Sequence, residues 1–276
     1  MWFLFGFPKV VYCDNMASLG ISYDMVLGSL MPVVVYWVYG GMYMALGSCD
    51  NYRLHPKEDE DEKNFASKET VIKGVLWQQF RQFIATNLLY MMTGGSHGGA
   101  SSAQPPSLTV IARQFVVAML VFDTYQYFLH RYLHHNKFLY RHLHSKHHRL
   151  VVPYPFGAIY SHPIEGFLFD ILGGSLAIFL SGMSPATSAF FSSFAAMKSV
   201  DDHCGLMLPG NPFHIFFENN TAYHDLHHQL YGGKYNFSQP FFAMWDRILG
   251  THMPYSLEKR EEGGFELQPA KECKND

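Results

Sequence analysis

The chain has 276 residues, of which 48% are hydrophobic and only 16% are charged, and this length suits one substantial domain. Aromatic residues also reach 16%, a composition that suits a protein solvated partly by lipid. The net charge of −3, without a long basic run, argues against a nucleic-acid-binding protein. The four cysteines form neither a C-x-x-C pair nor a regular framework, which argues against a disulfide scaffold and a thiolate zinc site.

The first part of the chain predicts an N-terminal extension followed by a membrane span. Residues 1–20 begin with an apolar stretch that lacks the basic leading region of a signal peptide, so we expect an uncleaved extension. Residues 25–49 contain no charged side chain and, as a helix rising about 1.5 Å per residue, exceed a hydrocarbon core of about 30 Å. The polar, mixed-charge stretch 50–70 then predicts a solvated loop.

Two further apolar stretches predict the second and third spans. Residues 74–93 form a second apolar stretch interrupted by Arg81, and the Gly- and Ser-rich residues 94–107 predict a turn-rich linker. The third stretch, 108–129, contains Arg113 and Asp123. Because an ionisable group is costly at this depth, Asp123 is expected to face a protein interior or a functional site, or to lie at the membrane interface.

The fourth apolar region, 171–197, contains 27 uncharged residues but is broken by Ser-Gly-Met-Ser-Pro at 181–185. A single span here would place the histidines before and after it on opposite sides of the membrane. We therefore expect a re-entrant or short helical hairpin over 166–199, with arms of about 15 residues. At roughly 22 Å each, such arms are too short to cross comfortably.

These segments together predict an all-α, multi-pass membrane bundle of three spans plus the hairpin. The loop 130–149 holds five Lys or Arg residues and no acidic residue, and the positive-inside rule therefore places it in the cytosol. Loop 50–70 is then cytosolic and linker 94–107 lumenal. The glycosylation sequons at Asn219 and Asn236 should also lie in the cytosol, where they would not be glycosylated.

Histidine is the outlier in the composition, because 13 of the 16 histidines lie between residues 130 and 228. Spacings of three and four place side chains on one helical face, so each H-x-x-H-H triplet is expected to point three imidazoles at one place. The eight histidines with this spacing are enough for two metal ions: His130, His134, His144, His147, His148, His224, His227 and His228.

The ligand type narrows the choice of metal without deciding it. Imidazole suits zinc, copper, iron and nickel alike. The zincin pattern H-E-x-x-H is absent, and an all-histidine pair of metals beside a membrane favours iron and O₂ chemistry on an apolar substrate. The isolated histidines His55, His97 and His252 are expected to be ordinary surface or hydrogen-bonding residues.

The three histidine boxes, with spans before them and an apolar hairpin between the last two, resemble the fatty acid hydroxylase superfamily. The narrower resemblance, to the plant sphingoid-base 4-hydroxylases, covers about residues 21–268. It is carried by the strings HHRLVVPYPFGA, SHPIEG, VDDHCGLMLPGNPFHIFF and YNFSQPFFAMWDRILGTHMPY. The resemblance implies a catalytic domain over 130–268, with 269–276 as a tail.

The resemblance implies metal ligation by the eight box histidines and adds His203, in Asp-Asp-His-Cys-Gly, as a ninth ligand. Three further histidines stay open: His162 as a tenth ligand or a residue behind the ligands, His135 as a supporting residue, and His214 as a packing or substrate contact. The acidic candidates to accept the outer N–H of ligand imidazoles are Asp123, Glu165, Asp201, Asp202 and Asp225.

The resemblance also implies the reaction. Two iron ions would reduce O₂ and insert one oxygen atom at carbon 4 of the long-chain base of sphinganine or ceramide. Because no G-x-G-x-x-G follows a predicted strand, electrons are expected from outside the chain. The resemblance implies that they come from NAD(P)H through an external reductase and a cytochrome b-type protein. The expected location is the endoplasmic reticulum membrane, with the catalytic face in the cytosol. The oligomeric state is not readable.

Other functions stay open at this stage. Within the same superfamily, the alternatives are a sterol 4-methyl oxidase and a fatty acyl hydroxylase or desaturase. A histidine-rich metal transporter or storage protein is an alternative of another class, which predicts bound metal without O₂-dependent turnover. A zinc-dependent membrane hydrolase is weaker, since no activated nucleophile is recognisable.

Overall fold

The computed structural model describes residues 23–92 and 106–270. The expected N-terminal extension 1–20, most of linker 94–107 and most of the tail 269–276 lie outside the described residues. Long helices form the body of the described part: α2 (Tyr23–Leu46), α4 (Lys68–Met92), α5 (Leu108–His135), the continuous segment α7 (Pro163–Gly166), η5 (Phe167–Gly173) and α8 (Gly174–Ser181), and α9 (Pro185–Asp202). The expected all-α membrane bundle is confirmed.

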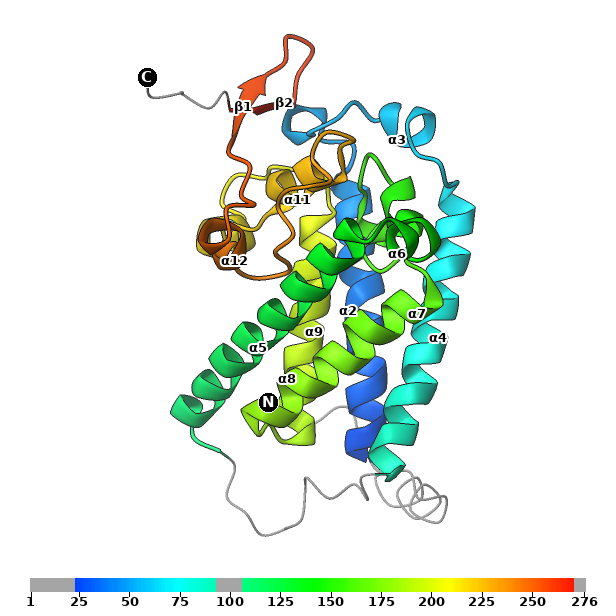
Figure 1. Ribbon diagram of the computed structural model, residues 1–276, viewed down its shortest axis with the longest axis vertical. Coiled ribbons are helices and arrows are strands. Elements are labelled where there is room, and N and C mark those ends of the chain that lie inside the picture. The colour runs from blue at the N-terminus through cyan, green and yellow to red at the C-terminus, as the bar shows by residue number, and fades with distance from the viewer. Residues whose placement is uncertain (1–22, 93–105, 271–276) are drawn as a thin grey trace, which may run out of the picture.

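Short elements gather at one end of these long helices, at the top of Figure 1. They are η1 (Asp50–Tyr52), α3 (Asp59–Glu62), α6 (Lys137–His142), η3 (His144–Arg149), η4 (Pro155–Gly157), α10 (Pro212–Phe216), α11 (Thr221–His228), α12 (Met244–Ile248), β1 (Tyr255–Lys259) and β2 (Phe265–Pro269). The strands form an antiparallel hairpin in which Leu257 pairs with Leu267. This end of the molecule contains the histidine boxes.

Local sequence signals fix where the histidine-bearing helices begin. The Asn136 side chain accepts hydrogen bonds from the Phe138 and Leu139 amides, which starts α6. Asn220 accepts from the Ala222 amide at 3.0 Å and likewise starts α11. A capping side chain pairs amides that a helix cannot satisfy itself, which contributes about 1 kcal/mol. These caps hold in place the short helices next to the site.

Within residues 23–92 and 106–270, three helices are long and apolar enough to cross a membrane: Val26–Leu46, Leu108–His135 and Pro163–Ser181. The predicted second span, 74–93, is not among them. It does form most of α4, but Gln78, Gln79 and Asn87 are buried polar residues that lower its hydropathy. α4 nevertheless packs against α2 and runs along the length of the bundle (Figure 1), so the second span stays a prediction.

The chain turns back at Gly182, as the broken hydrophobic pattern predicts. Gly182 adopts a positive φ of 68°, and the Ser184 hydroxyl then accepts from the Thr187 amide to start α9. The expected short arms are wrong, however, because the first arm has 19 residues and α9 has 18. Each spans about 27–29 Å at the usual rise, since helix continues past the uncharged stretch at both outer ends.

Glycines allow the helices and loops around the site to approach closely. A Cβ on Gly74 of α4 would come within 2.7 Å of the Tyr160 ring, and one on Gly166 within 1.5 Å of Gln78 Nε2. Both neighbours are buried, with Tyr160 and Gln78 each 1% exposed. Only a residue without a side chain fits at either contact. Gly74 and Gly166 therefore set the position of α4 against the segment that leads into the site.

Candidate metal centre

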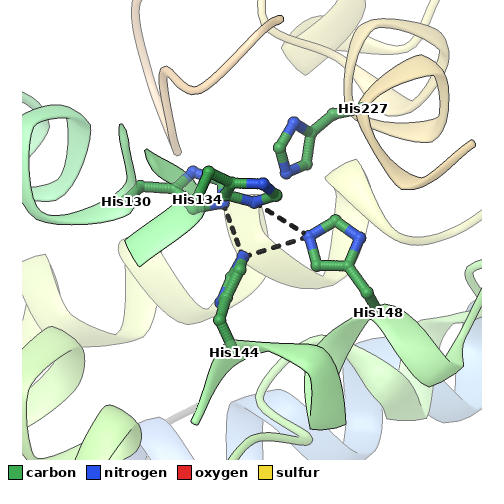
Figure 2. Close-up of side chains that lie close together, drawn as sticks. All are labelled: His130, His134, His144, His148 and His227. Carbon is green, nitrogen blue, oxygen red and sulfur yellow. Dashed lines mark hydrogen bonds between the residues drawn. The ribbon is translucent and has the colours of Figure 1, made fainter. Parts of the chain in front are cut away.

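Five histidines from three elements form a first group, shown in Figure 2. His130 and His134 come from the last turns of α5, His144 and His148 from η3, and His227 from α11. The His144 Nε2 atom lies 3.0 Å from Nε2 of both His130 and His148. The ring of His227 approaches the same centre from the side opposite His144 (Figure 2). The meeting of α5, η3 and α11 thus brings together residues from distant parts of the chain.

Four histidines form a second, fully buried group: His147, His203, His224 and His228. The His224 Nε2 atom lies 3.1 Å from Nε2 of both His203 and His228. His203 follows the last residue of α9, so the hairpin delivers it to the same end as α11. All nine histidines that the sequence and the resemblance singled out as ligands therefore lie in one of the two groups.

The H-x-x-H-H triplets do not act as the sequence predicted. In each triplet the first and last histidines, four positions apart, share a group, while the histidine between them belongs to the other group. His144 and His148 thus lie in the first group and His147 in the second. The expectation that three imidazoles of a triplet point at one place is wrong, because neighbouring residues of a helix turn in different directions.

The hydrogen-bond partner of the outer ring nitrogen, Nδ1, determines which of the two ring nitrogens holds the proton. Because a backbone carbonyl can only accept, Nδ1 must carry the hydrogen and Nε2 must present its lone pair. This applies to five rings, whose Nδ1 atoms donate to carbonyls at 2.7–3.1 Å: His130 to Phe237, His147 to Tyr160, His203 to Ser199, His227 to Tyr235 and His228 to Leu150.

Each group therefore gathers lone pairs around a centre. His227 Nε2 is buried and has no hydrogen-bond partner among the described residues. Lone pairs that face one another at about 3 Å repel unless a cation lies between them. Imidazole nitrogen is a suitable donor to iron, zinc, copper and nickel. The donor set fits two metal ions, one at each group.

Burial keeps the ligand candidates outside the spans in the neutral form that binds metal. Desolvation lowers the pKa of His147 and of His227 to about 4. Desolvation, helped by the neighbouring His147, lowers the pKa of His203 to about 3. A neutral imidazole is the form that donates to a metal. These side chains are ready to bind a cation at neutral pH.

One carboxylate supports a ring of the first group directly. Glu165 Oε1 accepts from His144 Nδ1 at 2.7 Å, and both side chains are buried. Such a bond orients a ligand ring and raises its basicity. Glu165 is at the start of the candidate span Pro163–Ser181, so the same helix that lines the membrane also fixes a ring of the metal site.

The other acidic candidates have different partners, and their expected role is wrong. Asp123 accepts from the Phe241 and Phe242 amides, and Asp202 pairs with Lys198. Asp201 bonds Asn211, and Asp225 bonds His55 at 2.9 Å. In most rings a backbone carbonyl takes the place that the sequence assigned to a carboxylate. Carbonyl partners cannot be recognised from residue type.

The three uncertain histidines lie outside both groups. His135 is exposed at the end of α5, and His162 caps α7 by accepting from the Ile164 amide at 3.3 Å. The Nε2 atom of His214 is 3.2 Å from a carboxylate oxygen of Asp201. His55, expected to be a surface or hydrogen-bonding residue, forms a hydrogen bond with Asp225 of α11. No sequence pattern pointed to that contact.

A cavity of about 330 Å³ extends from the histidines between the long helices. His144 of the first group and His147, His203 and His224 of the second line it. Much of its wall is apolar and includes Phe122, Ile178 and Phe191. A hydrocarbon chain can therefore lie among the long helices with one carbon beside the metal groups.

Comparison with known proteins agrees with this geometry. The model of the family "Fatty acid hydroxylase" matches residues 115–251, which include both histidine groups. "Sphinganine C4-monooxygenase 2" and "Sphinganine C4-monooxygenase 1", both of Arabidopsis thaliana, are 63% and 64% identical, over 95% and 92% of this chain and 100% and 97% of their own lengths.

A third relative is named for a different reaction. "Very-long-chain aldehyde decarbonylase GL1-9" of Oryza sativa subsp. indica is 54% identical over 92% of this chain and 98% of its own length. No solved structure matches the chain. The two Arabidopsis relatives and the matching family agree on one assignment: the chain belongs to the fatty acid hydroxylase family and is a homologue of the plant sphinganine C4-monooxygenases.

Proposed function

We propose that this protein is a di-iron monooxygenase that hydroxylates carbon 4 of sphinganine. The observation that carries the proposal is the pair of histidine groups at the end of a cavity among membrane helices. The names and full-length coverage of the two Arabidopsis relatives support the substrate. Iron held by the nine histidines would supply O₂ reduction and insertion of one oxygen atom into a C–H bond, with the other leaving as water.

The residues of the chain contribute position and exclusion of water. Rings of both groups are oriented from behind by Glu165 and by backbone carbonyls, so little rearrangement is needed when a cation binds. The apolar wall around Phe122 and Phe191 holds an alkyl chain in a fixed register. The carbon that is hydroxylated is then selected by how far the alkyl chain of the substrate extends along the cavity.

The aldehyde decarbonylase named for the rice relative is the second candidate function. Its 54% identity over 98% of that protein shows that the same fold is present. A very-long-chain aldehyde is also an alkyl chain with a small polar end. The two Arabidopsis relatives are more similar, which favours hydroxylation, and the products distinguish the two reactions.

Expression in cells that lack their own sphingoid-base hydroxylase tests the proposal. We expect phytosphingosine by mass spectrometry from the wild-type chain and none from His147→Ala or His227→Ala at equal membrane abundance. The matched control is His142→Ala, because His142 is exposed and outside both groups. An alkane from a long-chain aldehyde, with no phytosphingosine, would favour the decarbonylase instead.

The location and the electron donor belong to the same proposal. We place the enzyme in the endoplasmic reticulum membrane with the histidine end in the cytosol, where a cytochrome b-type protein and its reductase would deliver electrons from NAD(P)H. The basic residues around the site support this side: Arg131, Lys137, Arg141, Lys146 and Arg149. Their position also suits an acidic electron-transfer partner.

A further inference from the structure

The carboxylate of Asp170 lies in the cavity wall and has no part in holding the histidines. It belongs to η5, a π-helical stretch in the middle of the candidate span Pro163–Ser181. An ionisable group inside a span is costly and usually faces a protein interior or a substrate path. π-Helical stretches are likewise frequent at functional sites. Asp170 therefore needs a physical reason to be there.

Among the three carboxylates that line the cavity, Asp170 differs in its partners. Glu165 accepts from His144, and Asp202 forms an ion pair with Lys198. Asp170 Oδ2 instead accepts from the Gln82 amide at 2.5 Å, and Gln78 is its other hydrogen-bonding neighbour. No Lys or Arg is among the described residues that line the cavity. The hydrogen-bond partners of this carboxylate are thus neutral amides, and it forms no ion pair with the described residues.

The arrangement of Gln78 explains why its amide points at Asp170. Arg81 Nη2 donates to Gln78 Oε1 at 3.0 Å, so the Gln78 NH₂ group is turned towards Asp170. Gln78 is only 1% exposed and fills the space that the missing side chain of Gly166 leaves. The Gln78 amide thus lies between the Arg81 guanidinium and the Asp170 carboxylate. Asp170 is held in place without being neutralised.

Asp170 lines the same cavity as Glu165 and His144 of the first histidine group. Asp170 follows Glu165 by five positions on the continuous segment of α7 and η5, and both carboxylates line the cavity. The offset along the axis is about 7 Å at roughly 1.5 Å per residue. Glu165 bonds His144. A sphingoid base has its amine on carbon 2, two carbons from the carbon that is hydroxylated.

Building on the proposed function, we propose that Asp170, oriented by Gln78 and Gln82, binds the ammonium group of a free long-chain amine and so selects the free sphingoid base over ceramide. An uncompensated carboxylate in a low-dielectric cavity is complementary to a cation. The amide nitrogen of a ceramide is neutral and gives no such compensation. The alkyl chain would lie along Phe122, Ile178 and Phe191.

A binding experiment tests the ammonium site without turnover. The full chain in lipid nanodiscs is titrated with octadecylamine and with octadecanol, which differ only in the head group. We expect the wild-type protein to prefer the amine by roughly tenfold or more, and Asp170→Asn to lose that preference. Asp170→Glu should keep most of it, because the charge remains. Asp61→Asn, a matched change at an exposed carboxylate, should keep all of it.

Three binding results would overturn the proposal. They are equal affinities for amine and alcohol in the wild type, an amine preference retained by Asp170→Asn, and an equal loss of both ligands in that variant. The last would indicate a packing role, so metal content and gel-filtration behaviour of Asp170→Asn are measured beside it. The ammonium site is supported if Asp170→Asn loses the amine preference while its metal content and gel-filtration behaviour stay the same as in the wild type.

Turnover separates this inference from the proposed function. For Asp170→Asn we expect kcat/KM for sphinganine to fall about tenfold or more through KM, and that for N-acetylsphinganine to change less than about twofold. Equal losses would overturn the inference. If the wild type hydroxylates neither compound yet prefers the amine in binding, the proposed function fails and the ammonium site stands. Hydroxylation without amine preference would support the proposed function and overturn the ammonium site.

Discussion

At the residue scale, the two metal groups are built by interlocking the histidine boxes. Each H-x-x-H-H triplet contributes its first and last ring to one group and its middle ring to the other. His147 and His148 are neighbours in the chain but serve different groups, as do His227 and His228. The two triplets therefore connect the two histidine groups. Neither group can form from one box alone.

This interlocking predicts how double variants behave. His148 and His227 share a group, whereas His227 and His228 do not. If the two groups hold two irons, as proposed, His148→Ala with His227→Ala should retain about one of them, because only the first group is damaged. His227→Ala with His228→Ala should retain almost none, because a ligand is then missing from each group. Iron per chain, measured by mass spectrometry after dialysis against a chelator, checks this. Equal retention in both doubles would contradict the grouping.

At the element scale, contacts between helices and loops determine where the rings point. Tyr160 packs against Gly74 of α4, and its carbonyl accepts from His147 Nδ1 at 3.1 Å. A residue of α4 outside both histidine groups thus positions a ligand ring. The same logic holds for the Leu150 carbonyl, which orients His228 from the loop after η3.

The packing of Tyr160 on Gly74 predicts the effect of a single methyl group. Gly74→Ala would place a Cβ 2.7 Å from the buried ring, so Tyr160 must shift. We expect a loss of about 1–3 kcal/mol in stability and a lower iron content, because His147 loses its support. Gly41→Ala is the matched control in α2, since nothing lies within 4 Å of a Cβ there. Thermal unfolding and iron content are the measurements.

At the scale of the whole molecule, the hairpin of α7–η5–α8 and α9 returns the chain to the end where α5 finishes (Figure 1). This return brings His203 to His224 and both to the loop after α5. The sequons offer no test of orientation, because Asn219 and Asn236 are both 0% exposed and could not accept a glycan in the fold. The absence of a glycan at these two asparagines would be expected on either side of the membrane.

A protease-protection experiment tests the orientation instead. The β1–β2 hairpin lies at the histidine end, close to the C-terminal side of the described residues (Figure 1). We expect a tag fused after residue 276 to be degraded by protease added to sealed microsomes, while a lumenal marker protein survives. Survival of the tag until detergent is added would place the histidine end in the lumen and reject the proposed topology.

The sequence by itself determined which residues can form the site, because eight histidines at helical spacings are chemically distinctive and the family resemblance adds His203. It also determined the turn at Gly182, since Ser-Gly-Met-Ser-Pro at 181–185 interrupts the uncharged stretch 171–197. Only the tertiary structure decided which rings share a group, because neighbouring positions in η3 and α11 face different centres. Backbone carbonyls rather than Asp123, Asp202 or Asp225 hold most outer nitrogens, a choice that residue type cannot encode.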